Sequence, residues 1–117
     1  MMMLAAVAAL TVQASEAPPS RAQFTSLRAE LDANLLDYPT TRFREVTAKR
    51  GVVCGKMNAR NRMGAYTGWT DFGALFVDDE TSLYIADPDD PPLLLEMLCD
   101  GSRRPTSRDY SAEVTHR

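Results

Sequence analysis

One amphipathic stripe followed by several short β-prone runs is the feature that most restricts the fold of this chain. Apolar side chains recur at intervals of three and four residues at Phe24, Leu27, Leu31 and Leu35. This spacing predicts a helix that begins near Arg21 and ends near Tyr38-Pro39. The β-prone runs that follow are 43–49, 52–54, 65–72, 73–77 and 83–85. Because short consecutive strands with tight turns favour neighbouring pairing, we expect an antiparallel meander of about four short strands.

A short helix is predicted at the end of this domain. The apolar run over 93–99 follows a segment rich in Pro and Asp, with Asp89 and Asp90 near the positive end of the helix and Gly101 just past its last turn. We expect both helices to cover one face of the sheet, which gives a single two-layer α+β domain over residues 21–100. The polar stretch 101–117 lacks periodicity and is predicted to be a flexible tail.

The first residues predict export. Residues 1–14 combine a short apolar run with small residues where signal peptidase cuts, so we expect cleavage near Ala14, followed by a linker over 15–20. The run is too short for a permanent membrane-spanning helix, and the mature protein is expected to be periplasmic or secreted. Because no Lys or Arg precedes the apolar run, a buried N-terminal helix of a cytoplasmic protein is the alternative.

The predicted export indicates the oxidation state of the two cysteines. In an oxidising compartment, Cys54 and Cys99 form an even pair with one connectivity, and we expect a disulfide that ties the second strand to the last helix. In the chain-entropy model a loop of this length stabilises the fold by roughly 4 kcal/mol. In the cytosol the two would instead be separate buried thiols.

Charge is distributed unevenly along the chain. Residues 42–62 contain seven cations and one acid, whereas residues 71–100 contain nine acids and no cation. We favour mutual neutralisation by adjacent strands, and the alternative is a basic face for an acidic partner or an anionic surface polymer. Nucleic acid is not an expected partner, because the net charge is −3 and no nucleic-acid-binding motif is present.

A set of residues in the middle of the chain resembles a known group of sequences. The set comprises residues 36–46, Val53-Cys54-Gly55, Asn58, Asn61, Gly64, Tyr66, Gly68, Phe72 and Cys99. With this spacing the chain resembles a group of small exported bacterial proteins known mainly as hypothetical proteins, and the resemblance covers about half of the sequence. It implies export and the location of a site but no reaction. The chain departs from the group at Met57, Arg60 and Trp69, where the shared pattern has Val, Lys and Phe.

The segment 53–69 contains the candidate binding residues. These are Asn58, Arg60, Asn61, Arg62, Tyr66 and Trp69. We favour Asn58 and Asn61 as turn-building residues, because asparagine accepts left-handed backbone and bonds to neighbouring amides. Tyr66 and Trp69 are an odd number of positions apart, so a regular strand would place one in the core and expose the other. An exposed ring beside arginines would contact sugar rings, peptides or protein side chains.

No motif in the sequence predicts catalysis. The only histidine, His116, lies in the predicted tail, and neither a calcium loop nor a nucleotide-binding motif is present, so no catalytic residue, metal or cofactor is predicted. We expect a non-catalytic binding or accessory module of the bacterial cell envelope, with an envelope protein or glycan as partner. Two alternatives remain. One is a self-assembling subunit, and the other is a small hydrolase that uses the clustered acids Asp71, Asp78, Asp79, Glu80, Asp87 and Asp89.

Overall fold

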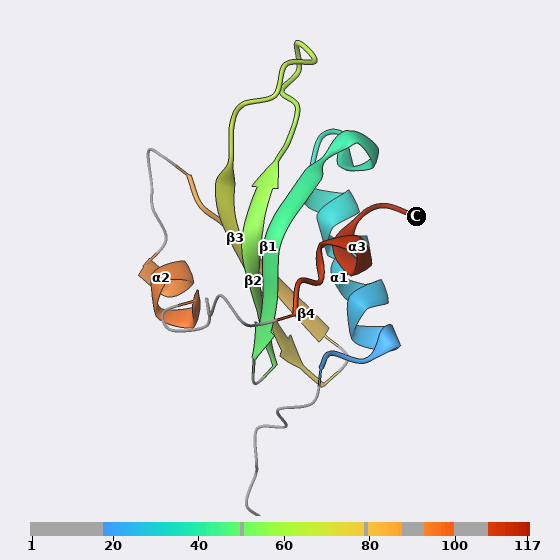
Figure 1. Ribbon diagram of the computed structural model, residues 1–117, viewed down its shortest axis with the longest axis vertical. Coiled ribbons are helices and arrows are strands. Elements are labelled where there is room, and N and C mark those ends of the chain that lie inside the picture. The colour runs from blue at the N-terminus through green and yellow to red at the C-terminus, as the bar shows by residue number, and fades with distance from the viewer. Residues whose placement is uncertain (1–17, 50, 79, 88–92, 100–107) are drawn as a thin grey trace, which may run out of the picture.

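A four-stranded antiparallel sheet in the order β1-β2-β3-β4 forms the centre of the protein in the computed structural model (Figure 1). The structure describes residues 18–49, 51–78, 80–87, 93–99 and 108–117. The elements are α1 (Arg21–Asn34), η1 (Tyr38–Thr40), β1 (Arg42–Lys49), β2 (Val52–Asn58), β3 (Thr70–Val77), β4 (Glu80–Ile85), α2 (Leu93–Cys99) and α3 (Ser111–Val114). The expected α+β class, with an N-terminal helix, an antiparallel meander and a short C-terminal helix, is confirmed. The predicted signal peptide, most of the linker and the acidic residues at 89–90 lie outside the described residues.

Helix α1 begins at a capping box and packs along the predicted stripe. The Ser20 hydroxyl accepts a hydrogen bond from the Gln23 N–H at 3.1 Å, and the Gln23 side chain accepts one from the Ser20 N–H at 2.9 Å. Each apolar residue that the helix buries stabilises the fold by roughly 1.5–3 kcal/mol; they are Phe24, Leu27 and Leu31. The helix ends at Asn34, earlier than predicted, because Leu35 has extended backbone and the chain then forms the one-turn helix η1 around Pro39.

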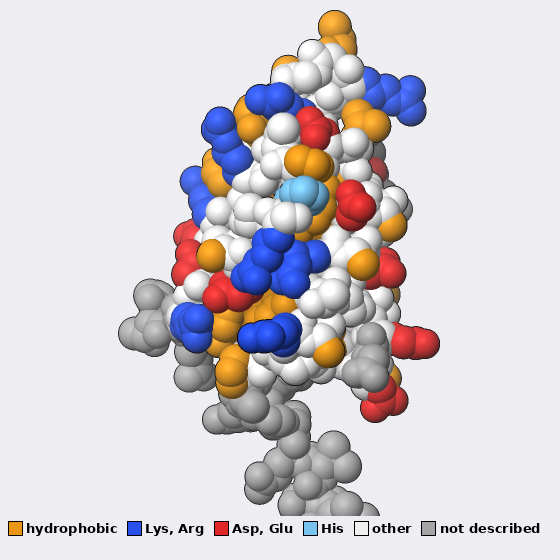
Figure 2. All heavy atoms as spheres, turned by 90° about the vertical axis from the view of Figure 1, so that its right-hand side faces the viewer, with side chains coloured by type: hydrophobic (Ala, Val, Ile, Leu, Met, Phe, Trp, Pro, Cys, Tyr) orange, Lys and Arg blue, Asp and Glu red, His pale blue; other side chains and the backbone are white. Residues whose placement is uncertain are grey.

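The face of the sheet that α1 covers contains one continuous apolar core. Its buried members are Phe24, Leu27, Leu31, Tyr38, Val46, Val53, Met57, Phe72, Ala74, Phe76 and Val114. Seen from the side that bears α1 and α3, apolar side chains reach the surface only in separate patches (Figure 2). We call this face of the sheet the core face and the opposite one the outer face.

The C-terminal residues 108–117 belong to the fold, so the prediction of a flexible tail is wrong for this segment. Val114 in α3 is fully buried, and its carbonyl oxygen accepts a hydrogen bond from the buried Tyr38 hydroxyl. The Tyr110 N–H donates to the Val46 carbonyl oxygen at 2.8 Å, which attaches the segment to the edge of β1. A four-residue helix is too short to show a 3.6-residue period, so the sequence pattern missed it.

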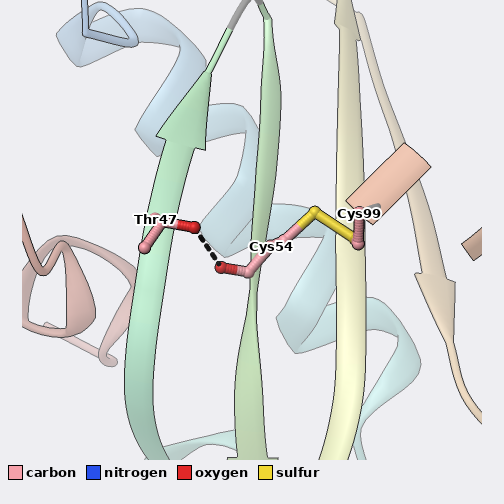
Figure 3. Close-up of a disulfide and its surroundings, with 3 residues drawn as sticks. All are labelled: Thr47, Cys54 and Cys99. Atoms are coloured by element: carbon pink, nitrogen blue, oxygen red, sulfur yellow. Dashed lines mark hydrogen bonds between the residues drawn. A yellow bond between two sulfur atoms is a disulfide. The ribbon is translucent and has the colours of Figure 1, made fainter. Parts of the chain in front are cut away.

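Helix α2 lies on the outer face, so the prediction that both helices share one face is wrong. Successive strand residues point to opposite faces, and Cys54 follows Val53 of the core. The disulfide joins Cys54 of β2 to Cys99 of α2, as expected, with 5.8 Å between the Cα atoms (Figure 3). At Gly73, which is paired with Cys54, a Cβ would lie 2.7 Å from Leu95 Cδ1 and 3.0 Å from Cys99 Sγ, so a larger residue there would force these side chains of α2 to shift.

A β-bulge in β1 changes which face its side chains occupy. Glu45 has a φ of 52°, and the register moves from Arg44↔Lys56 to Thr47↔Cys54, so that two residues of β1 lie opposite Gly55. A Cβ at Gly55 would lie 2.8 Å from Val46 Cγ2, so glycine is needed there. The extra residue puts both Phe43 and Val46 on the core face, although a regular strand would separate them.

Candidate binding surface

Arginine side chains lie over aromatic rings at one end of the outer face. The guanidinium carbon of Arg44 is 4.0 Å from the centroid of the Trp69 ring. Those of Arg42 and Arg60 are 4.2 Å and 5.0 Å from the centroid of the Tyr66 ring. These distances place all three within cation–π range. We call this group of five residues the arginine–aromatic surface.

Strand β1 and the loop that joins β2 to β3 bring the five residues together. Arg42 and Arg44 alternate along β1 with Phe43, which packs against the core, so both arginines project from the outer face. The loop contributes an isolated antiparallel bridge between Arg60 and Tyr66. In Figure 1 this loop projects beyond the helices at one end of the molecule.

Asparagine side chains hold the loop in shape. Asn61 Oδ1 accepts hydrogen bonds from the N–H groups of Met63 at 2.9 Å and Ala65 at 3.1 Å. Asn58 Oδ1 accepts one from the Gly68 N–H at 3.0 Å. These bonds are those of turn-building residues, the interpretation favoured from the sequence. Asn58 and Asn61 therefore position the surface by ordering the loop beside it.

Neither aromatic ring of the surface belongs to the core. Tyr66 is half-buried, and its hydroxyl donates to the Thr40 carbonyl oxygen at 2.9 Å. The Trp69 residue is 38% exposed. The prediction that one of the two lies in the core is wrong, because it assumed a regular strand, and β3 begins only at Thr70.

Most cations of the surface have no acidic neighbour in the described part of the chain. Glu45 Oε2 lies 3.9 Å from both Arg44 Nε and Lys56 Nζ, and these exposed pairs are weak. Arg42 and Arg60 form no ion pair with any described acid. The register of β2 and β3 places Lys56 of segment 42–62 opposite Asp71 of segment 71–100, whereas the ion pairs of Arg44 and Lys56 are with Glu45 of segment 42–62 itself. The expected neutralisation between the two segments therefore stays a prediction. In Figure 2, which faces α1 and α3, Lys and Arg side chains follow the left-hand edge and also cross the centre of the view, and acidic side chains lie on both the left and the right.

Arg60 also carries a hydrogen-bond donor without an acceptor. Its Nε atom is buried and makes no hydrogen bond. An unsatisfied buried donor costs about 1–3 kcal/mol, and because this atom is covered by the protein, a ligand could reach it only if the Arg60 side chain moved.

Arginines held on rings suit one kind of chemistry. A guanidinium group presents N–H donors in a planar fork that matches carboxylate and phosphate groups. Because Arg44 lies over Trp69 and two arginines lie over Tyr66, these contacts occupy ring surface that would otherwise stack on sugar rings. The arrangement is therefore chemically suited to anionic groups.

Sequence reasoning found three members of the surface and missed two. Arg60, Tyr66 and Trp69 were among the candidates, whereas Arg42 and Arg44 were not. Their alternation with Phe43 in a β-prone run was the available signal, because it predicts two cations on the solvent side of a strand. The sixth candidate, Arg62, is exposed in the loop and makes no ion pair with a described acid.

Two of the acids proposed for a hydrolase, Asp79 and Asp89, lie outside the described residues, and the four that are described do not all lie together. Asp71 lies near the start of β3 and Asp78 just past its end, so these two residues are about 23 Å apart at the usual rise per residue of a strand.

Among the described residues, no three His, Cys, Asp or Glu side chains are placed to hold a metal ion. None of the described helices has the length and apolar character to span a bilayer. The His116 ring packs against the Tyr38 ring, with 5.3 Å between the two ring centroids.

Comparisons with protein-family models, curated proteins and solved structures found no match to this chain.

Proposed function

We propose that this chain is an exported binding or accessory module of the bacterial cell envelope that recognises an anionic partner through the arginine–aromatic surface. The observation that carries the proposal is the set of three guanidinium groups lying over two aromatic rings at 4.0–5.0 Å. The apolar run over 1–14, the Cys54–Cys99 disulfide and the resemblance to small exported bacterial proteins support the compartment.

The aromatic rings increase the affinity of the arginines for an anionic partner, because they hold the arginine side chains in place before the partner binds. A free arginine side chain loses up to about 2 kcal/mol of conformational entropy when it is fixed. A contact with an aromatic ring is worth about 0.5–1 kcal/mol at an exposed site and already restricts the guanidinium group. A partner that binds here therefore orders less of the protein than one that binds to arginines free in solvent.

The partner is an envelope protein or glycan, and the surface selects the anionic members of both classes. Acidic side chains of a protein and uronic acids of a glycan present the same carboxylate group. Because ring surface is already occupied by arginines, a neutral sugar has less to bind here.

A titration of the oxidised protein with polyglutamate and, separately, with polygalacturonate tests the proposal. Trp69 is the only tryptophan in the chain and lies in the surface, so its fluorescence reports binding directly. The variant Arg42→Ala/Arg60→Ala is expected to weaken binding by at least about tenfold with little change in Tm, because Arg42 is exposed, Arg60 is half-buried and neither belongs to the core. The matched control is Arg21→Ala, an exposed arginine on α1. Equal affinities for the double variant and the control would contradict the proposal.

A second candidate, self-assembly, is favoured by one observation. Helix α2 exposes three large apolar side chains, Leu93 at 75%, Leu94 at 56% and Met97 at 75%. Apolar side chains grouped in this way are typical of protein contacts. Light scattering after size exclusion tests this candidate, and a strict monomer at high concentration would remove it.

A further inference from the structure

The loop between β2 and β3 has an exposed apolar side chain beside an exposed arginine. Met63 is 91% exposed, more than any other large hydrophobic residue in the described chain, and Arg62 precedes it. Figure 2 shows apolar side chains at the end of the molecule, with Lys or Arg side chains beside them. A lone exposed apolar side chain is common on protein surfaces. Here it lies beside arginines that form no ion pair with a described acid, and this combination suits a boundary that is both anionic and apolar.

The exposure of Met63 results from an ordered turn. Asn61 Oδ1 accepts from the Met63 N–H at 2.9 Å, and the Gly64 N–H donates to the Asn61 carbonyl oxygen at 2.9 Å. Below the turn, the Asn61 N–H donates to the Ala65 carbonyl oxygen at 2.9 Å, and Arg60 is bridged to Tyr66. The loop therefore presents Met63 in a fixed conformation, which lowers the entropic cost of inserting it into a partner.

We propose that the end of this loop docks on an anionic phospholipid bilayer. Met63 enters the boundary between headgroups and acyl chains, while Arg60 and Arg62 bind lipid phosphates. This pairing of an inserted apolar side chain with flanking cations is how interfacial segments hold to anionic lipid. The inference rests on the proposed function, because it uses the same anion-binding arginines, and it adds a lipid surface to the envelope protein or glycan proposed as partner.

The charges around the loop favour lipid over a dissolved polyanion. Arg42, Arg60 and Arg62 make no ion pair with described acids, so their charge is available to a surface. A dissolved polyanion would neutralise these arginines but offers no apolar medium for Met63. A bilayer offers both an anionic surface and an apolar medium.

Vesicle binding by the oxidised mature chain, residues 15–117, tests the inference. This chain contains every described residue. Co-sedimentation is expected with vesicles of equal parts phosphatidylcholine and phosphatidylglycerol, and not with phosphatidylcholine alone. Met63→Ala is expected to lower the partition coefficient about tenfold through lost apolar burial, and Arg62→Ala about fivefold through lost attraction. Raising the salt concentration weakens binding of the unchanged protein.

Two matched controls separate the loop from the rest of the surface. Met97→Ala removes a comparably exposed methionine from α2, and Arg21→Ala removes an exposed arginine from α1, and both are expected to bind as the unchanged protein does. In the variant Met63→Trp/Trp69→Phe, the emission of the single tryptophan is expected to shift to shorter wavelength on anionic vesicles. Absence of that shift, or equal effects of Met63→Ala and Met97→Ala, would overturn the inference.

The polyglutamate titration of the same preparations distinguishes the two proposals. If vesicles fail to bind while polyglutamate binds in a manner that depends on Arg42 and Arg60, the bilayer inference is overturned and the proposed function stands. If neither binds, both are overturned.

Discussion

The two faces of the sheet are built in different ways. The core face is held by a continuous apolar cluster in which α1, α3 and the strands bury side chains such as Leu31 and Phe72 completely. On the outer face, α2 buries only Leu95 and is joined to the sheet by a disulfide. Apolar burial on the core face therefore stabilises the fold, and much of the outer face is left available for contacts with partners.

The largest expected effect is on the core face. Phe72→Ala should lower the free energy of unfolding by about 3–5 kcal/mol, because it leaves a cavity where the ring is fully buried. Urea denaturation measures this loss. A loss below about 1 kcal/mol would show that this face is not the main source of stability.

Removing the disulfide tests how the outer face is held. Cys54→Ala/Cys99→Ala should cost about 2–4 kcal/mol of unfolding free energy. Because α2 has one buried side chain, its amides should lose protection against hydrogen exchange while those of α1 keep theirs. If α1 and α2 lose protection equally, the two faces are not held independently.

Alkaline pH tests the attachment of the C-terminal segment to the core face. Burial raises the pKa of Tyr38 to about 12, because the charged phenolate is disfavoured there. The folded protein thus retains the proton that the unfolded chain releases near pH 10, so stability is complete below that pH and falls as pH rises toward 12. The expected loss at pH 12 is about 2 kcal/mol.

Tyr38→Phe removes this pH dependence and supplies the control. The variant also lacks the hydrogen bond to the Val114 carbonyl oxygen, so it is expected to be less stable at neutral pH. Denaturation curves of both proteins across the alkaline range measure the difference. Parallel losses in the two proteins would mean that Tyr38 is not the group responsible.

The smallest effect on stability is expected on the arginine–aromatic surface. Arg44→Ala removes one contact with the Trp69 ring and should cost no more than about 1 kcal/mol. Thermal unfolding measures the change in Tm. A loss as large as that of Phe72→Ala would make this surface part of the structural core and remove the contrast between the faces.

Local patterns in the sequence predicted much of the core face. The spacing of Phe24, Leu27 and Leu31 is a property of one helix, so it can be recognised without knowing the fold. The pairing of Cys54 with Cys99 followed from there being only two cysteines. Both predictions are confirmed.

The outer face could be predicted only in part because its contacts join distant segments. The bulge at Glu45, a residue that seldom has positive φ, has no signature in the sequence. Stacking of Arg44 on Trp69 depends on that strand meeting the end of a loop far along the chain. On the core face, the burial of Val114 also depends on contacts between distant segments, because the C-terminal segment packs against α1 and β1.

Backbone amide chemical shifts in a titration with polyglutamate test the central claim most directly. We predict changes confined to the first residues of β1 and to the loop around Arg60 and Tyr66, with none on α1 or α3. The Trp69 indole N–H should move with the same concentration dependence. Changes confined to the helices of the core face, or none at saturating polyglutamate, would contradict the assignment of anion binding to the arginine–aromatic surface.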